Sequence, residues 1–154
     1  MILESKIFKK KGYWFFGFSG SGKSFASKYL KKKKKNSIII DGDEVRKYVS
    51  FDLKYTKKHR DMQIKRIYGI GKIAIKSDLF PIISTVWMNK IILKKAKSIG
   101  IKVIRINYSN INKKLFSRKI KKNIVGYDIF YENFKTDEII NSKDNNFKKI
   151  LCRI

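Results

Sequence analysis

Short apolar runs and longer stretches of helical spacing follow one another along this chain. Four of the short runs are rich in aromatic or β-branched residues and are of strand length, so they predict buried strands. They cover residues 13–16, 38–40, 80–86 and 101–106. Pro81 is tolerable in the third run because it stands near its start. Strands that alternate with helices predict an α/β fold with a mostly parallel sheet.

Helical spacing of the apolar residues fills the segments between these runs. It predicts helices over residues 25–30, about 57–79, and 89–98, the last of them stopped by Gly100. Thr56 is a suitable N-cap for the long central helix. The final segment, residues 136–154, fits either a helix or an edge strand, so the pattern leaves it open.

Length and composition indicate one compact domain, residues 1–154, because the chain has 154 residues and a single proline. One cysteine, Cys152, leaves no internal disulfide, so a reducing compartment suffices. The sequence shows no signal-peptide pattern, and no apolar run approaches the roughly 18 residues that a membrane span needs. We therefore expect a cytoplasmic protein without a membrane partner.

The chain is strongly basic, with 38 Lys and Arg against 12 Asp and Glu and a net charge of +26. Such a charge suggests a nucleic-acid partner. The lysines, however, are spread through nearly every segment and accompany abundant Ile and Asn, which A/T-rich codons also encode. Even the five lysines at 31–35 fit a solvated helix end. Codon composition explains the charge well enough that we do not expect nucleic-acid binding.

Residues 17–24, G-F-S-G-S-G-K-S, match the phosphate-binding pattern G-x-x-x-x-G-K-[ST] between a predicted strand and a predicted helix. The glycines allow consecutive amides to wrap a triphosphate. Lys23 is expected to reach the β- and γ-phosphates, and the Ser24 hydroxyl is placed for Mg²⁺. The expected ATP-binding residues are Gly17, Ser19, Gly20, Ser21, Gly22, Lys23, Ser24 and Phe25.

A second chemical centre, Asp41, Asp43 and Arg46, directly follows the predicted strand 38–40. Ligands of open α/β sheets bind beyond the carboxyl ends of the strands, where the γ-phosphate would also lie. One aspartate, with Asp41 the candidate, would hold Mg²⁺, and the other would accept the proton of an attacking hydroxyl. Which of them is the base stays open, as does a purely structural role in which Asp43 caps a helix.

Four segments, taken in order, resemble the adenylylsulfate (APS) kinase family: residues 17–24, 41–46 (D-G-D-x-x-R), 52–66 and 126–132. The resemblance implies a three-layer P-loop kinase fold with a mobile lid over about 107–124. It also implies transfer of the ATP γ-phosphate to a ribose 3′-hydroxyl of a nucleotide that carries a second acidic group, and leaves a homodimer open.

The same resemblance gives roles to single positions. Arg46 and Arg60 would bind phosphate-type groups, Tyr55 would stack on the base, and Gln63 would replace the family's Asn. Arginine forks and a neighbouring ring suit a nucleotide without any reference to the family. The expected acceptor-binding residues are Asp43, Arg46, Tyr55, Arg60, Gln63, Ser84, Thr85, Trp87, Lys113, Lys114 and Ile124.

Departures from the family are concentrated on the acceptor side. Residues 84–90 read S-T-V-W-M-N-K where the family typically has S-F-I-S-P-Y-R, and Tyr55 and Gln63 are changed as well. These changes favour an acceptor other than adenylylsulfate. We expect cytidine diphosphoramidate, which another kinase of the superfamily phosphorylates during capsule biosynthesis. The alternatives are adenylylsulfate itself and, from another class, a basic nucleic-acid-binding protein that uses ATP as a switch.

Overall fold

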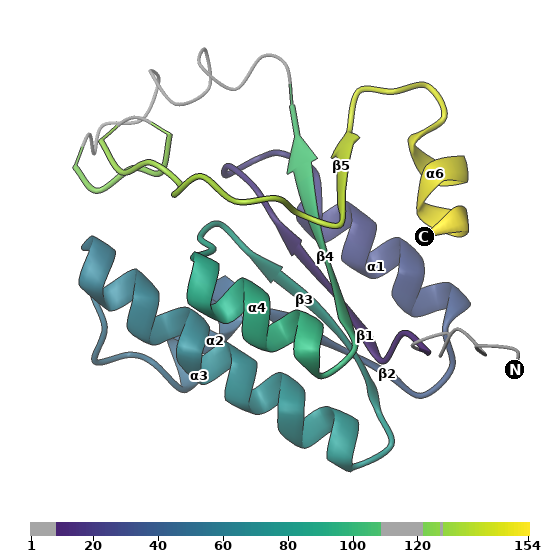
Figure 1. Cartoon of the computed structure of the whole chain (residues 1–154), viewed down its shortest axis with the longest axis horizontal. Helices are drawn as coiled ribbons and strands as arrows, with labels where there is room; N and C mark the ends of the chain where they lie inside the picture. Colours follow the sequence, from purple (N-terminus) through teal and green to yellow (C-terminus); the bar gives the residue numbers. More distant parts are fainter. Residues whose placement is uncertain (1–8, 109–121, 127) are drawn as a thin grey trace, which may run out of the picture.

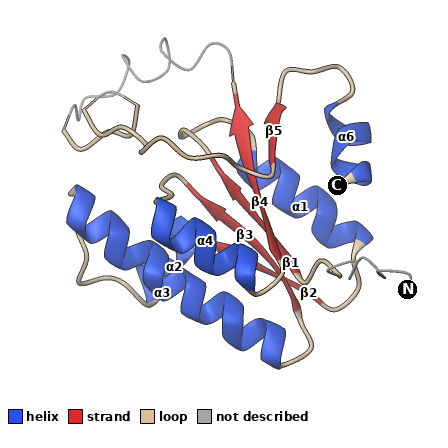
Figure 2. Ribbon diagram, in the orientation of Figure 1, coloured by secondary structure: helices blue, strands red, loops and turns tan. Residues whose placement is uncertain are grey.

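A computed structural model of the chain describes residues 9–108, 122–126 and 128–154. Its five strands form one sheet in the order β2-β3-β1-β4-β5, and every neighbouring pair is parallel (Figures 1 and 2). The strands are β1 (Gly12–Phe16), β2 (Ser37–Asp41), β3 (Phe80–Thr85), β4 (Ile101–Asn107) and β5 (Glu138–Asn141). The predicted α/β class and parallel sheet are confirmed.

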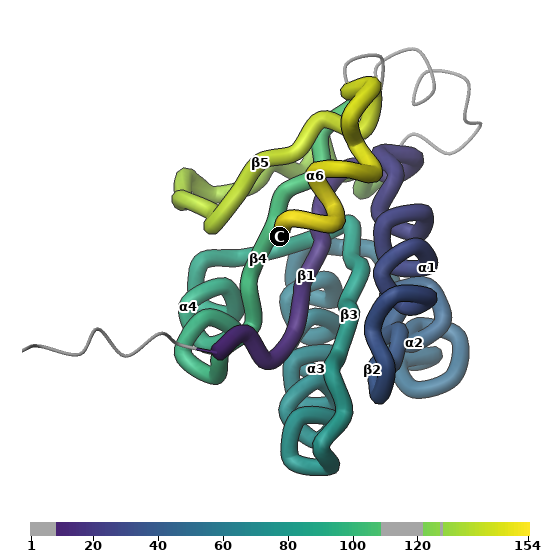
Figure 3. Tube along the Cα trace, turned by 90° about the vertical axis from the view of Figure 1, so that its right-hand side faces the viewer, coloured from purple at the N-terminus to yellow at the C-terminus, as the bar shows by residue number. Residues whose placement is uncertain are grey.

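Helices cover both faces of this sheet, which gives the predicted three layers (Figure 3). One face carries α1 (Lys23–Lys33) and α6 (Phe147–Arg153), and the other carries α2 (Gly42–Tyr48), α3 (Lys57–Lys76) and α4 (Lys90–Ser98). The strands between them are apolar on both sides; Trp14, Phe15 and Phe16 of β1 are all fully buried. Such a strand can sit only in the middle of the sheet.

The strand at 38–40 was predicted to be buried, and this is only partly right. β2 pairs with β3 alone and is therefore an edge strand, so Ile40 is 4% exposed while Ile38 is 37% exposed. Three consecutive isoleucines cannot distinguish an edge position from a central one, because that depends on which strands lie beside them.

The helix predictions hold, with small shifts at their ends. Thr56 caps α3 by accepting a hydrogen bond from the backbone N–H of His59, and α3 ends at Lys76 rather than near 79. The last segment, left open above, contains both an edge strand and a helix. Among the described residues, no helix combines the length and apolarity needed to cross a membrane.

The parallel register brings three chain segments together at the carboxyl edge of the sheet. Phe16, the last residue before the phosphate-binding loop, lies opposite Thr85, and Asp41 lies opposite Ser84. The loop after β1, the start of α2 and the segment after β3 therefore meet at one place. This is the edge at which open α/β sheets bind ligands.

Candidate active site

The loop between β1 and α1 has the conformation that wraps a phosphate group. Gly20 and Gly22 have φ values of 79° and 99°, a region in which a side chain would be strained. Gly22 is also the residue from which α1 starts, so the positive end of that helix faces the loop. The predicted nucleotide loop thus has its expected form.

Lys23 is held inside this loop. Its Nζ donates to the carbonyl oxygen of Phe18 at 2.7 Å and lies 3.4 Å from Oγ of Ser21. Burial lowers the pKa of Lys23 to about 8, although Asp43 and Asp41 act in the opposite direction. Among the described residues no carboxylate contacts this ammonium group, which is therefore well suited to receive phosphate oxygens.

The two aspartates at the end of β2 and the start of α2 differ in their hydrogen bonds. Asp41 is the N-cap of α2: its Oδ1 accepts from the backbone N–H of Asp43 at 2.9 Å, and its Oδ2 accepts from the Ser84 hydroxyl at 2.7 Å. The capping role that we assigned to Asp43 as an alternative therefore belongs to Asp41. Asp43 is exposed and lines the cavity described next. Of the pair, Asp43 has the freer carboxylate.

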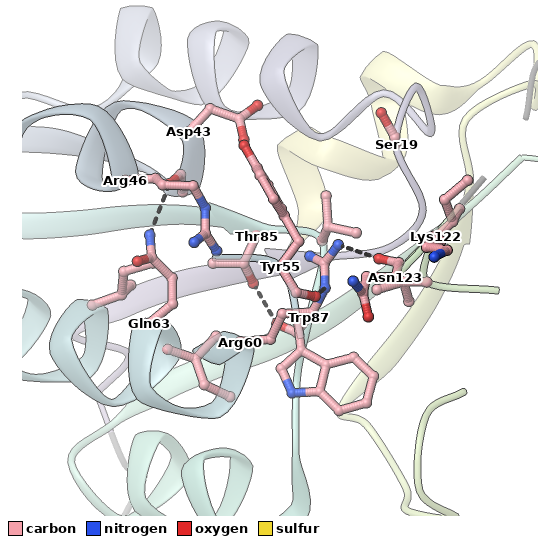
Figure 4. A pocket seen from close by; sticks show the side chains of 16 residues that line it. Ser19, Asp43, Arg46, Tyr55, Arg60, Gln63, Thr85, Trp87, Lys122 and Asn123 are labelled. Carbon is pink, nitrogen blue, oxygen red and sulfur yellow. Dashed lines mark hydrogen bonds between the residues drawn. The ribbon is translucent and has the colours of Figure 1, made fainter. Parts of the chain in front are cut away.

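A cavity of about 600 Å³ lies beside the loop, between α2, α3 and the segments that follow β3 and precede Val125. Figure 4 shows Ser19 of the loop on one side of it, Asp43 and Arg46 on another, and Trp87 at its base. Most of the predicted acceptor-binding residues in the described part of the chain line it: Asp43, Arg46, Tyr55, Arg60, Gln63, Thr85, Trp87 and Ile124.

Arg46 and Arg60 flank the Tyr55 ring, with their guanidinium carbons 4.6 and 5.6 Å from its centroid. Among the described residues both donate to carbonyl oxygens: Arg46 to Leu53 and Lys54, Arg60 to Tyr55 and Asn123. Among the described residues, neither has a carboxylate partner. Burial is the main cause that lowers the pKa of each arginine. An anionic ligand would stabilise these two partly buried positive charges.

Gln63 is buried on α3 and donates from Nε2 to the carbonyl oxygen of Gly42 at 2.9 Å. Its Oε1 has no hydrogen-bond partner in the described structure. The residue therefore links α3 to the start of α2, and it is among the residues that line the cavity. Its predicted place in the acceptor site is consistent with this geometry.

The wall after β3 is held by a residue that the sequence did not indicate, Asp61. Trp87 is 2% exposed, donates from Nε1 to Asp61 Oδ1 at 2.8 Å and stacks on Tyr131. The same Asp61 oxygen accepts from Asn89 Nδ2. Asp61 was missed because nothing near it in the sequence marks it: its partners lie 26 and 28 residues away.

The remaining predicted site residues are corrected, are committed to other contacts, or lie beyond the described structure. Ser84 is 3% exposed and bonds to Asp41, so it positions that carboxylate and does not line the cavity. Thr85 lines it but is committed, accepting from Trp14 and donating to the Trp87 carbonyl. Lys113 and Lys114, and most of the predicted lid over 107–124, lie outside the described residues.

The residues at this edge fit a magnesium ion that arrives with a nucleotide. No group of three or more His, Cys, Asp and Glu able to hold a metal is present in the described residues. Mg²⁺ in kinases needs only one or two protein groups besides phosphates and water. Ser24 is exposed at the start of α1, and Asp43 has a carboxylate to which the described residues donate no hydrogen bond. The Ser24 hydroxyl suits the ion better than the predicted Asp41, whose two oxygens already accept hydrogen bonds.

Comparison with known proteins gives the family. The family model described as adenylylsulphate kinase matches residues 9–112, well over half of the chain. The chain belongs to the adenylylsulphate kinase family. It is 33% identical over 94 residues to an adenylyl-sulfate kinase of Buchnera aphidicola from Acyrthosiphon pisum, an alignment that covers 55% of this chain and 46% of that protein.

A second member of the family aligns over a longer stretch. The adenylyl-sulfate kinase of Buchnera aphidicola from Schizaphis graminum is 27% identical over 167 residues, 90% of this chain and 77% of that protein. In the first two relatives, by contrast, this chain spans less than half of their length, 46% and 39%.

Among solved structures, the Mycobacterium tuberculosis APS kinase CysC in complex with AMPPNP and APS is similar, with a TM-score of 0.78. The alignment covers 94% of this chain and 95% of that one at 17% identity. At that identity the likeness supports the P-loop kinase fold alone. The family names also bear on our acceptor prediction: they favour adenylylsulfate, our alternative, and give no support to cytidine diphosphoramidate or to a role in capsule biosynthesis.

Proposed function

We propose that this protein is an ATP-dependent kinase that phosphorylates the 3′-hydroxyl of adenylylsulfate. The observation that carries the proposal is the cavity beside the phosphate-binding loop, in which two arginines without carboxylate partners flank the exposed Tyr55 ring. Adenylylsulfate offers the matching chemistry: an adenine ring to stack, and a phosphate and a sulfate to accept guanidinium hydrogen bonds.

ATP would bind with its phosphates in the loop. Lys23 would exchange its present carbonyl and hydroxyl partners for phosphate oxygens, and the loop amides would donate to the same groups. Ser24 would hold Mg²⁺, which supplies charge neutralisation on the phosphates, and the Asp43 carboxylate would stay available for the acceptor. The γ-phosphate would then face the cavity where Ser19 borders it.

Asp43 is our choice for the group that accepts the hydroxyl proton. It lies at the rim of the cavity, whereas both oxygens of Asp41 accept hydrogen bonds that fix α2 and β3. Proton acceptance by a positioned carboxylate fits the kinase template, in which the hydroxyl oxygen attacks the γ-phosphorus and ADP leaves. Asp41 would position this residue through the backbone N–H of Asp43.

The acceptor is the finer part of the proposal. Adenylylsulfate is preferred to cytidine diphosphoramidate because the relatives are named for it. Trp87 and Gln63, which suggested a changed acceptor, are buried and hydrogen-bonded, so they shape the cavity chiefly by packing. The cavity is large enough for a nucleotide, since ligand sites commonly measure about 300–1,000 Å³.

The test is ADP release from ATP and Mg²⁺ with adenylylsulfate, cytidine diphosphoramidate, AMP or CDP as the acceptor. We expect turnover with adenylylsulfate at least about tenfold above the others, and a product that carries the new phosphate at the 3′ position. Arg60→Lys is measured beside the unaltered chain, because lysine keeps the positive charge but lacks the planar guanidinium group. Equal background rates with all four acceptors would refute the proposal.

A further inference from the structure

A group of stacked aromatic rings borders the phosphate-binding loop on the side away from the acceptor cavity. Phe25, which directly follows Ser24, stacks on Phe147 of α6 and on Tyr29, with centroid separations of 5.9 and 6.1 Å and interplanar angles of 29° and 12°. Phe25 is 46% exposed. A large apolar ring left this open on the first turn of α1 is not explained by core packing.

The stack touches the loop at a different point from the cavity. The cavity reaches the loop at Ser19. At Gly22, by contrast, an added Cβ would meet Ser142 at 2.9 Å and the Phe147 ring at 3.9 Å. The segment between β5 and α6 therefore packs on the end of the loop where α1 begins, and Figures 1 and 3 show α6 beside α1.

A nucleoside triphosphate in this loop has two ends. If its γ-phosphate faces the acceptor cavity, its nucleoside must leave the loop on the other side, beside the first turn of α1. There the exposed aromatic surface among the described residues is that of Phe25, backed by Phe147 and Tyr29. A nucleobase is a flat apolar ring whose stacking on an aromatic side chain is worth about 1–3 kcal/mol.

We propose that Phe25, held by Phe147 and Tyr29, is the platform on which the adenine of ATP stacks. The inference rests on the proposed use of ATP, but not on the identity of the acceptor. Phe147 is 8% exposed and belongs to the core between α1, α6 and the sheet, so it fixes the Phe25 ring from a rigid element. Lys148, whose Nζ lies 6.0 Å from the Phe25 centroid, adds a cation beside the same ring.

The experiment distinguishes the contribution of the base to binding from that of the phosphates. Binding of ATP and of inorganic tripolyphosphate, each with Mg²⁺, is measured by calorimetry for the unaltered chain, Phe25→Leu and Phe25→Trp. Leucine keeps an apolar group against Phe147 but removes the ring. We expect Phe25→Leu to weaken ATP binding roughly 5- to 100-fold, the range that the stacking energy gives. Tripolyphosphate binding should stay within about twofold, and Phe25→Trp should bind ATP at least as well as the unaltered chain.

The control is Phe51→Leu, a ring that is 81% exposed on the α2–α3 connection, and it should leave both ligands unaffected. Equal weakening of ATP and tripolyphosphate in Phe25→Leu would assign the ring a structural role and overturn the inference, as would unchanged ATP binding. The proposed function fails separately: if ATP binds through Phe25 but adenylylsulfate is not phosphorylated, the platform stands and the acceptor assignment falls.

Discussion

The phosphate-binding loop and the acceptor cavity adjoin each other, but they are assembled in different ways. The loop is one continuous segment, residues 17–24, whose shape comes from its own glycines and from Lys23 folded back on Phe18. The cavity is lined by residues of four separate segments: residues 42–46, 55–67, 85–87 and 122–125, besides Ser19. A change in the loop should therefore affect every acceptor alike, whereas a change in the cavity should discriminate between acceptors.

The largest effect should come from the loop. Lys23→Ala removes the buried ammonium that is expected to meet the transferring phosphate, so kcat should fall roughly 10³-fold with every acceptor. Steady-state ADP release measures it. Lys28→Ala, an exposed lysine one turn further along α1, is the control and should keep normal turnover. A Lys23→Ala variant with near-normal rates would remove the loop from the active site.

Next in size is the pair of aspartates. Asp43→Asn should lower kcat about 10²-fold with little change in melting temperature, because its carboxylate lies at the cavity rim and holds no part of the fold. Asp41→Ala should instead lower stability by about 1 kcal/mol through loss of the α2 cap.

Steady-state kinetics and thermal unfolding of both variants test this assignment, in which Asp43 serves catalysis and Asp41 serves stability. The reverse pattern, with Asp43→Asn destabilised and Asp41→Ala inactive but stable, would exchange the two roles.

The cavity should show its selectivity through the arginines. Arg60→Lys should raise the KM for the acceptor roughly 10- to 100-fold, the worth of lost charge-assisted hydrogen bonds, and leave the KM for ATP within about twofold. Initial rates at varied acceptor and at varied ATP test it. Arg153→Lys, on the exposed end of α6, is the matched control. A parallel rise in both KM values would show that the two sites are not separable.

A smaller effect is expected from pH on the affinity for ATP. The pKa of Lys23 is about 8 in the nucleotide-free protein, and bound phosphates would raise it. Binding is then strongest below pH 8 and weakens as the pH rises through that value, by about tenfold between pH 7 and 9. Calorimetric titration of ATP with Mg²⁺ at both pH values measures this change. Lys23→Ala should lose the dependence, and a flat profile in the unaltered chain would contradict the assignment.

The contrast between the contiguous loop and the cavity built from separate segments also explains what could be predicted from the sequence. The loop is contiguous, so its glycines, Lys23 and Ser24 were found as one motif, and strands and helices followed from periodicity. Arg46, Tyr55, Arg60 and Gln63 were predicted to bind the acceptor, and all four line the cavity, since α2 and the start of α3 are close in the chain. These are short-range features.

What failed depends on partners that are distant in the sequence. The family resemblance made Ser84 a candidate substrate ligand, but it bonds to Asp41, 43 residues away. Asp61 carried no signal, since its role exists only once Trp87 and Asn89 are packed against α3. The edge position of β2 likewise follows from the strand order and not from its own three isoleucines.

The Thr85 hydroxyl, which accepts from Trp14 and donates to the carbonyl of Trp87, ties together the only two indoles of the chain. Trp14 is sealed in β1 at 0% exposure, while Trp87 lines the acceptor cavity. Trp87 can therefore report on the cavity by its fluorescence, and the buried Trp14 serves as an internal reference. A change in intrinsic fluorescence when an acceptor enters should come from Trp87 and disappear in Trp87→Phe, whose remaining emission would report only the interior of the sheet.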